Sequence, residues 1–460
     1  MDREEIKHIW NNLTLNKYLL LRINEHYIIR AFEPKSRYKI LNYTGREILD
    51  KLEKKINFDQ FINYMLENYE VKEKRLLYDI MNFLNILRDE KIIIFPDDIK
   101  NDVGESGKRT NGNIKNKNDL TNLVYDYYFA RNQPYKVFLE LTYNCNLKCK
   151  HCYLGNARFK LLQYTPLERI KELLTELKNS GVIEVFITGG EPFLHPNFFE
   201  ILEYAVDMNF FVTILTNGTC INDENIQRLL KLKVNDIKIS IYGFGKTHDK
   251  FVGVENSFNR SMTALGLLRE NNLGKAVTVL NTENVNEIYL LKDFLEQLNI
   301  EHEVSPLIFP TLYGDPSPTN YRLNEQQLKQ VIKNLNIKIG GNICTAGVSR
   351  FRITPDGDVN PCEMLRHISF GNINKVKFQD ILISEKRERW IKVVKNKIIN
   401  EKCGECNLKR FCINCMGLSY LETGKLDSVS QFACLLARVQ NEIWGKNKKR
   451  RTKAYDENLS

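Results

Sequence analysis

The chain of 460 residues lacks any apolar run long enough to cross a bilayer, which takes about 20 consecutive residues. Its start, Met1-Asp2-Arg3-Glu4-Glu5, lacks the apolar core of a secretion signal. We therefore expect a cytoplasmic protein without a membrane partner.

A concentrated charge of one sign is also missing. The formal net charge is +10, but it is spread along the chain, apart from a basic run at residues 446–451. A basic excess can indicate nucleic-acid binding, yet a scattered one is more typical of a solvated surface. We expect no nucleic-acid partner. With 43% apolar and 27% charged residues, the composition is that of a soluble globular protein, and the length suggests two to four domains.

Cysteine, in contrast, is plentiful. Eleven cysteines in a reducing compartment are more consistent with metal ligands than with disulfides. Ten of them fall into two groups, at 145–152 and 344–434. The remaining one, Cys220, is expected to be a partly buried thiol.

The first group has the spacing C-x3-C-x2-C, formed by Cys145, Cys149 and Cys152. An apolar run at 137–142 precedes it and reads as a buried strand, so the cysteines lie on the loop at its carboxyl end, where open α/β folds bind ligands. Three thiolates can hold three irons of a [4Fe–4S] cluster and leave the fourth iron open. The alternative is a structural zinc site, which normally needs four closed ligands.

This spacing, followed at once by the aromatic Tyr153, resembles the signature of the radical S-adenosylmethionine (SAM) enzymes. From residue 136 onward, strands alternate with helices, which predicts a parallel sheet. We expect an α/β fold, a partial (β/α)6 barrel. Its six strands are expected at 137–142, 182–188, 210–215, 236–241, 275–280 and 300–306.

The second strand ends in Thr188-Gly189-Gly190-Glu191-Pro192, which matches the Gly-Gly-Glu-Pro motif of the same family. Glycines permit close approach of the backbone to a ligand, and Glu191 can accept a hydrogen bond from an amino group. The resemblance implies SAM contacts at the carboxyl ends of the strands. The expected SAM-contacting residues are Tyr153, Gly189, Gly190, Glu191, Pro192, Asn217, Ser240 and Asn281. No general base can be assigned.

The last quarter of the chain holds seven cysteines and resembles the SPASM domain, an auxiliary-cluster module of peptide- and protein-modifying radical SAM enzymes. The resemblance implies a distal [4Fe–4S] cluster on Cys403, Cys406, Cys412 and Cys434. It implies a proximal [4Fe–4S] cluster on Cys344, Cys362 and Cys415, which makes three clusters in total. This sequence departs from the family in having two residues before Cys415 instead of three. A closed zinc site on Cys403, Cys406, Cys412 and Cys415 is the alternative.

Seven cysteines cannot fill the eight positions of two complete clusters. We therefore hypothesise that the proximal cluster keeps an open iron, which binds a cysteine thiolate of the substrate.

The front of the chain reads as a small winged-helix-like α+β module. Strands are expected at 18–23, 27–32, 38–42 and 91–95, and helices at 46–52, 58–69 and 75–87. The stretch Leu41-Asn42-Tyr43-Thr44-Gly45-Arg46 resembles the peptide-binding chaperone of quinone-cofactor biosynthesis. This resemblance implies that the leader of a ribosomally made precursor peptide adds a strand beside the third strand and packs on the third helix. A DNA-binding winged helix and a plain structural cap are the alternatives.

Residues 97–122 are polar and poor in large apolar side chains, which predicts a flexible linker. We thus expect a leader-recognition domain at 1–96, a linker at 97–122, the radical SAM barrel at 123–340, the auxiliary domain at 341–440 and a basic tail at 441–460.

Together these resemblances imply a peptide maturase that forms a thioether crosslink and takes electrons from flavodoxin or ferredoxin. Maturases that make carbon–carbon links, or that oxidise Ser or Cys in a protein as sulfatase maturases do, are alternatives. A third reading is a non-catalytic iron–sulfur sensor that reads DNA.

Overall fold

The computed structural model describes residues 2–16, 18–23, 26–31, 39–100, 119–155, 164–232, 234–271, 273–340, 344–395 and 401–445. It divides into two compact units, residues 1–130 and 131–460. Most of the predicted linker, at 101–118, and most of the predicted basic tail, at 446–460, lie outside the described residues. Within the described ranges, no helix has the length and apolar character to cross a membrane.

The first unit contains the hairpin predicted from the sequence. Strands β2 (Tyr18–Ile23), β3 (His26–Ala31) and β4 (Lys39–Leu41) form an antiparallel sheet in that order. Strand β5 (Ile93–Ile94) pairs instead with β1 (Thr14–Leu15). The three predicted helices are present as α2 (Tyr43–Glu53), α3 (Phe58–Asn68) and α4 (Glu73–Asp89).

Three helices of this unit were not predicted, namely α1 (Arg3–Asn12), α5 (Pro96–Lys100) and α6 (Asp119–Ala130). Helix α1 contributes Trp10, which stacks on Phe61 at 4.1 Å and donates to the carbonyl of Ile56 at 2.8 Å. The described ends of the predicted linker are helical, since α5 occupies 96–100 and α6 begins at 119. The linker prediction was therefore wrong for those residues.

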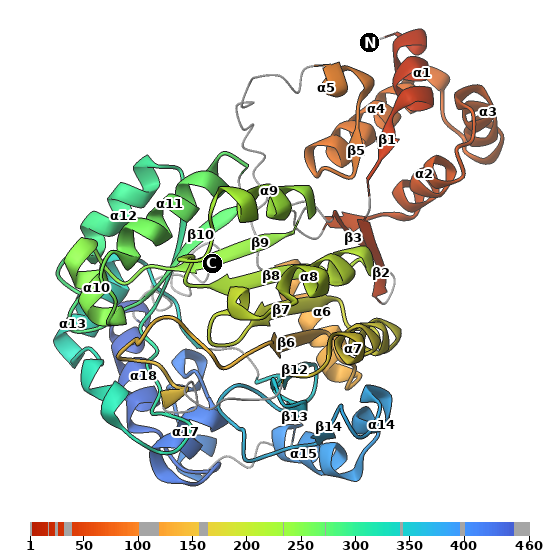
Figure 1. The fold of residues 1–460 in the computed structure, drawn as a ribbon. Coiled ribbons are helices and arrows are strands. Elements are labelled where there is room, and N and C mark those ends of the chain that lie inside the picture. The colour runs from red at the N-terminus through yellow and green to blue at the C-terminus, as the bar shows by residue number, and fades with distance from the viewer. Residues whose placement is uncertain are drawn as a thin grey trace, which may run out of the picture. The chain divides into compact units, whose positions relative to one another are not determined.

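The second unit is built on a nine-stranded sheet with the order β11-β10-β9-β8-β7-β6-β12-β13-β14. Its six parallel strands follow the chain order across the sheet and lie close to the predicted positions (Figure 1). They are β6 (Lys136–Glu140), β7 (Glu184–Thr188), β8 (Phe211–Thr216), β9 (Asp236–Ser240), β10 (Gly274–Val279) and β11 (Glu301–Ser305). The predicted α/β fold with six parallel strands is confirmed.

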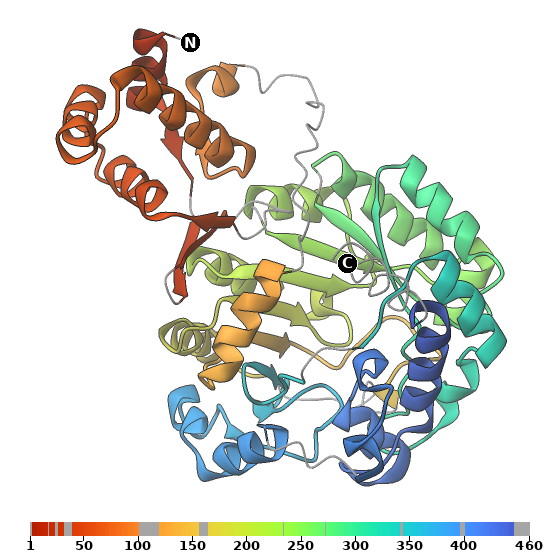
Figure 2. The ribbon, with the colours of Figure 1, turned by 180° about the vertical axis from the view of Figure 1, so that it is seen from behind.

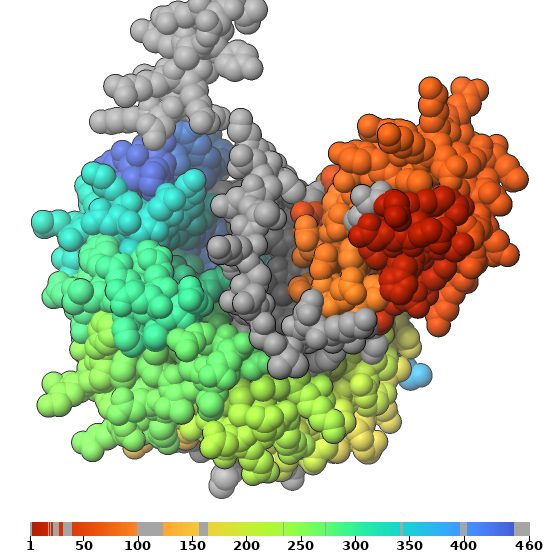
Figure 3. Space-filling view, turned by 90° about the horizontal axis from the view of Figure 1, so that it is seen from above, coloured from red at the N-terminus to blue at the C-terminus, as the bar shows by residue number. Residues whose placement is uncertain are grey.

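Helices connect these strands and cover one face of the sheet. They are α7 (Leu167–Asn179), α8 (Phe198–Asp207), α9 (Asp223–Leu232), α10 (Gly245–Val252), α11 (Ser257–Arg269) and α12 (Ile288–Gln297). Consecutive strand–helix pairs lie side by side, which Figure 3 shows as neighbouring bands from yellow-green to teal. Along β6 the burial alternates. Val137 and Leu139 are buried, whereas Phe138 remains partly accessible. One face of the sheet thus forms the core, and the other stays partly open.

The cysteine-rich region follows α13 (Glu325–Asn334). Its hairpin, β12 (Arg350–Ile353) and β13 (Asp358–Asn360), is followed by β14 (Gly371–Asn372). The helices of this region are α14 (Phe378–Leu382), α15 (Glu385–Lys395), α16 (Glu401–Gly404), α17 (Met416–Thr423) and α18 (Gln431–Trp444). Both Figure 1 and Figure 2 show α18 against α13.

The sequence predicted the hairpin but not where it docks. Strand β12 pairs in parallel with β6, and the partners include Arg350 with Lys136 and Arg352 with Phe138. The auxiliary region therefore continues the sheet of the barrel, and the two share one hydrogen-bonded framework.

Candidate active site

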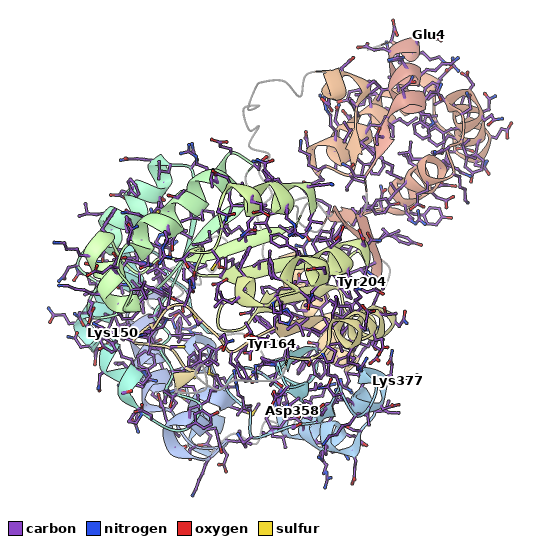
Figure 4. The ribbon with its side chains drawn as sticks, in the orientation of Figure 1. Glu4, Lys150, Tyr164, Tyr204, Asp358 and Lys377 are labelled. Atoms are coloured by element: carbon purple, nitrogen blue, oxygen red, sulfur yellow. The ribbon has the colours of Figure 1, made fainter. Side chains whose placement is uncertain are left out.

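The first three cysteines lie on the loop that follows β6, as the sequence predicted. Two backbone carbonyls of α10 hold this loop by hydrogen bonds. The backbone N–H groups of Lys148 and Lys150 donate to the carbonyls of Val252 and Phe251 at 2.7 and 3.0 Å. Lys150, labelled in Figure 4, also forms an ion pair with Glu283 at 2.6 Å. These contacts fix the backbone that carries the thiols.

The thiols of Cys145, Cys149 and Cys152 all lie within electrostatic reach of the Tyr242 side chain. Burial raises the pKa of Tyr242, and negative charge on all three thiols raises it further. Tyr242 belongs to a small apolar cluster with Leu147 and Phe251, against which Cys145 and Cys149 pack. Three thiols gathered at the carboxyl end of a parallel strand fit the donor set of a cluster with one open iron. Among the described residues, no group of three or more His, Cys, Asp and Glu side chains is close enough to hold one metal ion, so these thiols do not form a mononuclear site.

The two glycines of the Gly-Gly-Glu-Pro motif pack directly on the segment that leads into the cysteines. A Cβ at Gly189 would lie 2.3 Å from the carbonyl oxygen of Thr142, and one at Gly190 would lie 2.3 Å from that of Asn144. The backbone N–H of Gly190 donates to Thr142 at 2.7 Å. In the sequence we ascribed both glycines to the approach of a ligand. The structure shows that close packing between two loops already requires them.

Glu191 is completely buried and joins two strand ends. Its carboxylate accepts hydrogen bonds from the Thr216 hydroxyl at 2.7 Å and from the Asn217 backbone N–H at 2.8 Å. Burial raises the pKa of Glu191 to about 7, although these hydrogen bonds oppose the shift. A carboxylate has about four acceptor positions, so capacity for a further donor remains. Pro192 follows as the first residue of a short 3-10 helix (Pro192–Leu194).

Asn217 connects the motif to the cluster loop. Its side-chain amide donates to Asn146 at 2.8 Å and lies 4.0 Å from the sulfur of Cys145. Its side-chain oxygen accepts from Thr219 at 2.9 Å. The sequence placed Asn217 among the SAM contacts, and the structure adds a role in supporting the cluster.

Of the other residues predicted to contact SAM, Ser240 and Asn281 lie at or just after strand ends at the same edge of the sheet, and Tyr153 lies in the cysteine loop. Ser240 is the last residue of β9 and hydrogen-bonds Tyr242. Asn281 is completely buried, and its side chain is used within its own loop, where it accepts from Glu283 at 2.9 Å and donates to Val279 at 3.0 Å. The carbonyl of Tyr153 accepts from Leu312 at 2.9 Å.

Sequence reasoning gave no role to His151 and did not find Tyr242 or Phe251. His151 stacks on Phe251 at 5.0 Å and meets Tyr242 edge-on at 4.7 Å. Burial lowers the pKa of His151 to about 4, so its imidazole is neutral at physiological pH. No sequence motif identifies these rings, because they contact the cysteine loop only through the tertiary fold.

The seven auxiliary cysteines form two separate groups. Cys362 lies within electrostatic reach of Cys344 and Cys415, and their negative charges raise its thiol pKa beyond the effect of burial. Cys434 stands in the same relation to Cys403, Cys406 and Cys412. Cys415 thus lies near Cys344 and Cys362, whereas Cys403, Cys406 and Cys412 lie near Cys434.

Backbone N–H groups point at several of these sulfurs. The N–H groups of Leu408, Asn414 and Leu418 donate to the sulfurs of Cys406, Cys412 and Cys415 at 3.5, 3.4 and 3.4 Å. Donors of this kind stabilise thiolates over thiols. The two groups therefore fit negatively charged ligands of iron–sulfur clusters.

Three family models match the chain. Residues 139–295 match the radical SAM superfamily, residues 344–407 the SPASM iron–sulfur cluster-binding domain, and residues 31–93 the coenzyme PQQ synthesis protein D (PqqD). The fold and the thiol groups define an iron–sulfur enzyme of the α/β class. The chain is a radical SAM enzyme with SPASM and PqqD domains.

Its relatives include peptide-maturation enzymes and heme synthases. The subtilosin biosynthesis protein AlbA of Bacillus subtilis is 30% identical over 55% of this chain and 60% of its own length. The PqqA peptide cyclase of Bradyrhizobium diazoefficiens is 23% identical over 68% and 88%. An AdoMet-dependent heme synthase of Methanosarcina barkeri is 26% identical over 64% and 94%.

Solved structures share the fold. Streptococcus suis SuiB bound to S-adenosylmethionine has a TM-score of 0.57 and 16% identity, over 92% of this chain and 99% of that one. The structure of anSMEcpe with bound AdoMet has a TM-score of 0.55 and 18% identity, over 70% and 96%.

Proposed function

We propose that this enzyme installs a thioether crosslink between a cysteine sulfur and a carbon atom of a ribosomally made precursor peptide. When bound, the cluster on Cys145, Cys149 and Cys152 and its SAM supply a 5′-deoxyadenosyl radical, which removes a hydrogen atom from the peptide. The chain's proposed SAM contacts are Tyr153, Gly189, Gly190, Glu191, Pro192, Asn217, Ser240 and Asn281.

The observation that carries the proposal is the unequal number of thiols in the two auxiliary groups. All eleven cysteines lie among the described residues. Cys434 and three other cysteines form a group of four, whereas Cys362 and two other cysteines form a group of three. A four-iron cluster on three protein thiolates keeps one iron available for a thiolate from the substrate. Such a site would hold the peptide cysteine and promote loss of its thiol proton.

The structure of the first unit favours the proposal that the substrate is a peptide. Strand β4 has β3 as its partner, and within the described residues its other edge carries no strand. An open edge offers backbone donors and acceptors to an extended peptide. The match of residues 31–93 to PqqD covers this strand and all of α4.

Helix α4 contacts β4 at one end and the first turn of α2. Lys39 of β4 forms an ion pair with Glu90 at 2.8 Å, and Phe83 packs against Gly45. Between these two contacts, Ile86 is 49% exposed, and Ile40 is equally exposed on β4. Exposed isoleucines beside an open strand edge form a suitable surface for alternate side chains of a leader.

Leader binding can be tested on the full chain with a fluorescently labelled precursor. We expect Ile86→Asp and Ile40→Asp each to weaken binding at least tenfold, about 1.4 kcal/mol. Leu290→Asp, which alters a residue of α12 that is 65% exposed, should leave binding unchanged. Deletion of residues 1–96 should weaken binding in the same way but preserve SAM cleavage without peptide. Unchanged affinity in the two isoleucine variants would reject the leader surface.

The crosslink itself is tested by mass spectrometry of co-expressed candidate precursors. A thioether removes one hydrogen from carbon and one from sulfur, so the mass falls by two hydrogens and one thiol resists alkylation. The same mass loss with every thiol alkylatable would indicate a carbon–carbon link instead, and a new aldehyde would indicate oxidation of Ser or Cys.

Metal analysis tests the cofactor set. Three [4Fe–4S] clusters correspond to about twelve irons per chain. Stoichiometric zinc with about four irons would contradict the two auxiliary clusters.

A further inference from the structure

Arg350 and Glu363 form a charge pair next to the group of Cys344, Cys362 and Cys415. One guanidinium nitrogen of Arg350 donates to both carboxylate oxygens of Glu363. Glu363 directly follows Cys362 in the chain, so the pair is fixed beside that thiol.

The position of Arg350 relative to Cys344 is fixed as well. A tight turn joins the two, in which the Gly347 N–H donates to the Arg350 carbonyl at 2.7 Å and the Arg350 N–H donates to the Thr345 carbonyl at 3.1 Å. The indole N–H of Trp390 secures this turn from outside by donating to Ala346 at 2.8 Å. Arg350 therefore cannot leave the cysteine group without disruption of the turn.

The third cysteine comes from a different element. Cys415 is the N-cap of α17, and its sulfur accepts from the Leu418 N–H at 3.4 Å. A Cβ at Gly417 would lie 3.7 Å from the sulfur of Cys362, so the first turn of α17 packs against the Cys362 loop. The three cysteines of this group thus come from three separate segments of the chain.

Both charges lie within electrostatic reach of these thiols. Arg350 acts on Cys344, Cys362 and Cys415, and Glu363 acts on Cys344 and Cys362. Arg350 also lies over the ring of Phe138 at 4.4 Å, on the partly open face of the barrel, and 34% of its side chain is accessible.

We propose that Arg350 and Glu363 set the reduction potential of the cluster held by Cys344, Cys362 and Cys415. The inference rests on the proposed function, because that function supplies the cluster. Reduction adds one electron, which makes the cluster more negative. A nearby positive charge stabilises that form, and a nearby negative charge destabilises it. Arg350 keeps its proton throughout, so no proton accompanies the electron.

The two members of the pair predict opposite shifts, which separates an electrostatic role from a structural one. Removal of the positive charge by Arg350→Gln leaves Glu363 uncompensated and lowers the potential. Removal of the negative charge by Glu363→Gln leaves Arg350 uncompensated and raises it. Local loosening of the structure would act in the same direction in both variants.

The experiment is a potentiometric titration, followed by electron paramagnetic resonance, of the full chain with Cys145, Cys149 and Cys152 replaced by Ala. This background removes the signal of the SAM-binding cluster and keeps the two auxiliary clusters. We expect each neutral variant to change the one-electron equilibrium of one auxiliary cluster by about tenfold, equivalent to about 59 mV, in opposite directions. The other auxiliary cluster should not change.

Two controls accompany the titration. Arg350→Lys keeps the charge and should shift the equilibrium by less than about threefold. Arg169→Gln breaks a partly buried pair with Glu176 on α7, at 2.8 Å, and should shift neither cluster.

Shifts of equal sign in the two neutral variants, or shifts no larger than that of Arg169→Gln, would overturn the inference. Iron analysis of the parent protein distinguishes this failure from that of the proposed function. A parent with about four irons has lost one auxiliary cluster, which would overturn both.

Discussion

The side-chain amide of Asn217 lies 4.0 Å from the sulfur of Cys145, while its backbone N–H donates to Glu191 at 2.8 Å. One residue therefore contacts both a thiol of the cluster loop and the carboxylate of the Gly-Gly-Glu-Pro motif. A donor directed at a cluster sulfur stabilises the reduced cluster, because that form carries more negative charge.

Asn217→Ala should lower the reduction potential of the first cluster. Loss of one hydrogen bond of about 1 kcal/mol corresponds to roughly 40 mV for one electron. Potentiometric titration of this cluster measures the shift. Asn222→Ala is a suitable control, since the side chain of Asn222 is exposed and its oxygen accepts from the Asn225 N–H at 2.9 Å. An equal shift in both variants would show that the Asn217 side chain does not set the reduction potential of the first cluster.

SAM affinity should depend on pH through Glu191. Burial raises its pKa to about 7, so its carboxyl becomes protonated as the pH falls below 7. If the carboxylate binds the SAM ammonium, affinity decreases about tenfold per pH unit below 7, since binding then requires loss of the proton. Anaerobic equilibrium dialysis measures this dependence.

Glu191→Gln serves as the matched variant, with weaker binding and a flat profile below pH 7. The nearby histidines do not interfere, because burial lowers the pKa of both His151 and His195 to about 4. A wild-type affinity independent of pH would show that the Glu191 carboxylate does not bind the ammonium.

Gly190→Ala should prevent assembly of the first cluster. The added Cβ would lie 2.3 Å from the Asn144 oxygen and 2.5 Å from the Tyr143 oxygen, so the segment before Cys145 must move. Iron per chain should fall by about four of roughly twelve, because the auxiliary clusters remain. Gly266→Ala, in α11, meets no atom within 4 Å and should retain full iron content. Full iron in Gly190→Ala would contradict the packing argument.

The buried pair of Glu140 and Arg352 should stabilise the junction between the barrel and the auxiliary hairpin. Both side chains are inaccessible, and the Arg352 guanidinium donates to Glu140, to Asn360 at 3.0 Å and to Tyr143 at 3.2 Å. Glu140→Gln leaves a buried guanidinium without its counterion and should cost about 3–5 kcal/mol.

The double variant Glu140→Leu with Arg352→Met removes both charges of the pair and should cost less than Glu140→Leu alone or Arg352→Met alone. Thermal unfolding of the three variants gives the comparison. Additive losses would show that the two residues act independently and would contradict the pairing.

Local patterns in the sequence were enough to find the parallel sheet and the cysteine motifs. Strands β6 to β11 are short apolar runs that alternate with segments of helical periodicity. Such runs can be recognised in the sequence without knowledge of tertiary contacts. The C-x3-C-x2-C and Gly-Gly-Glu-Pro motifs are continuous in sequence for the same reason. Helix α1 and the helical ends of the predicted linker escaped this reasoning, because their residues are mainly polar, and α1 gains its stability from the packing of Trp10 on Phe61.

The sequence by itself predicted which thiols and which motif serve this radical SAM enzyme, because iron–sulfur clusters are held by cysteine thiolates and cysteines are visible in the sequence. Only the tertiary structure decided how distant segments meet. It joined β12 to β6, placed Cys415 with Cys344 and Cys362, and brought Arg350 to Glu363. Such contacts depend on the three-dimensional course of the chain, and no local pattern of residues encodes them.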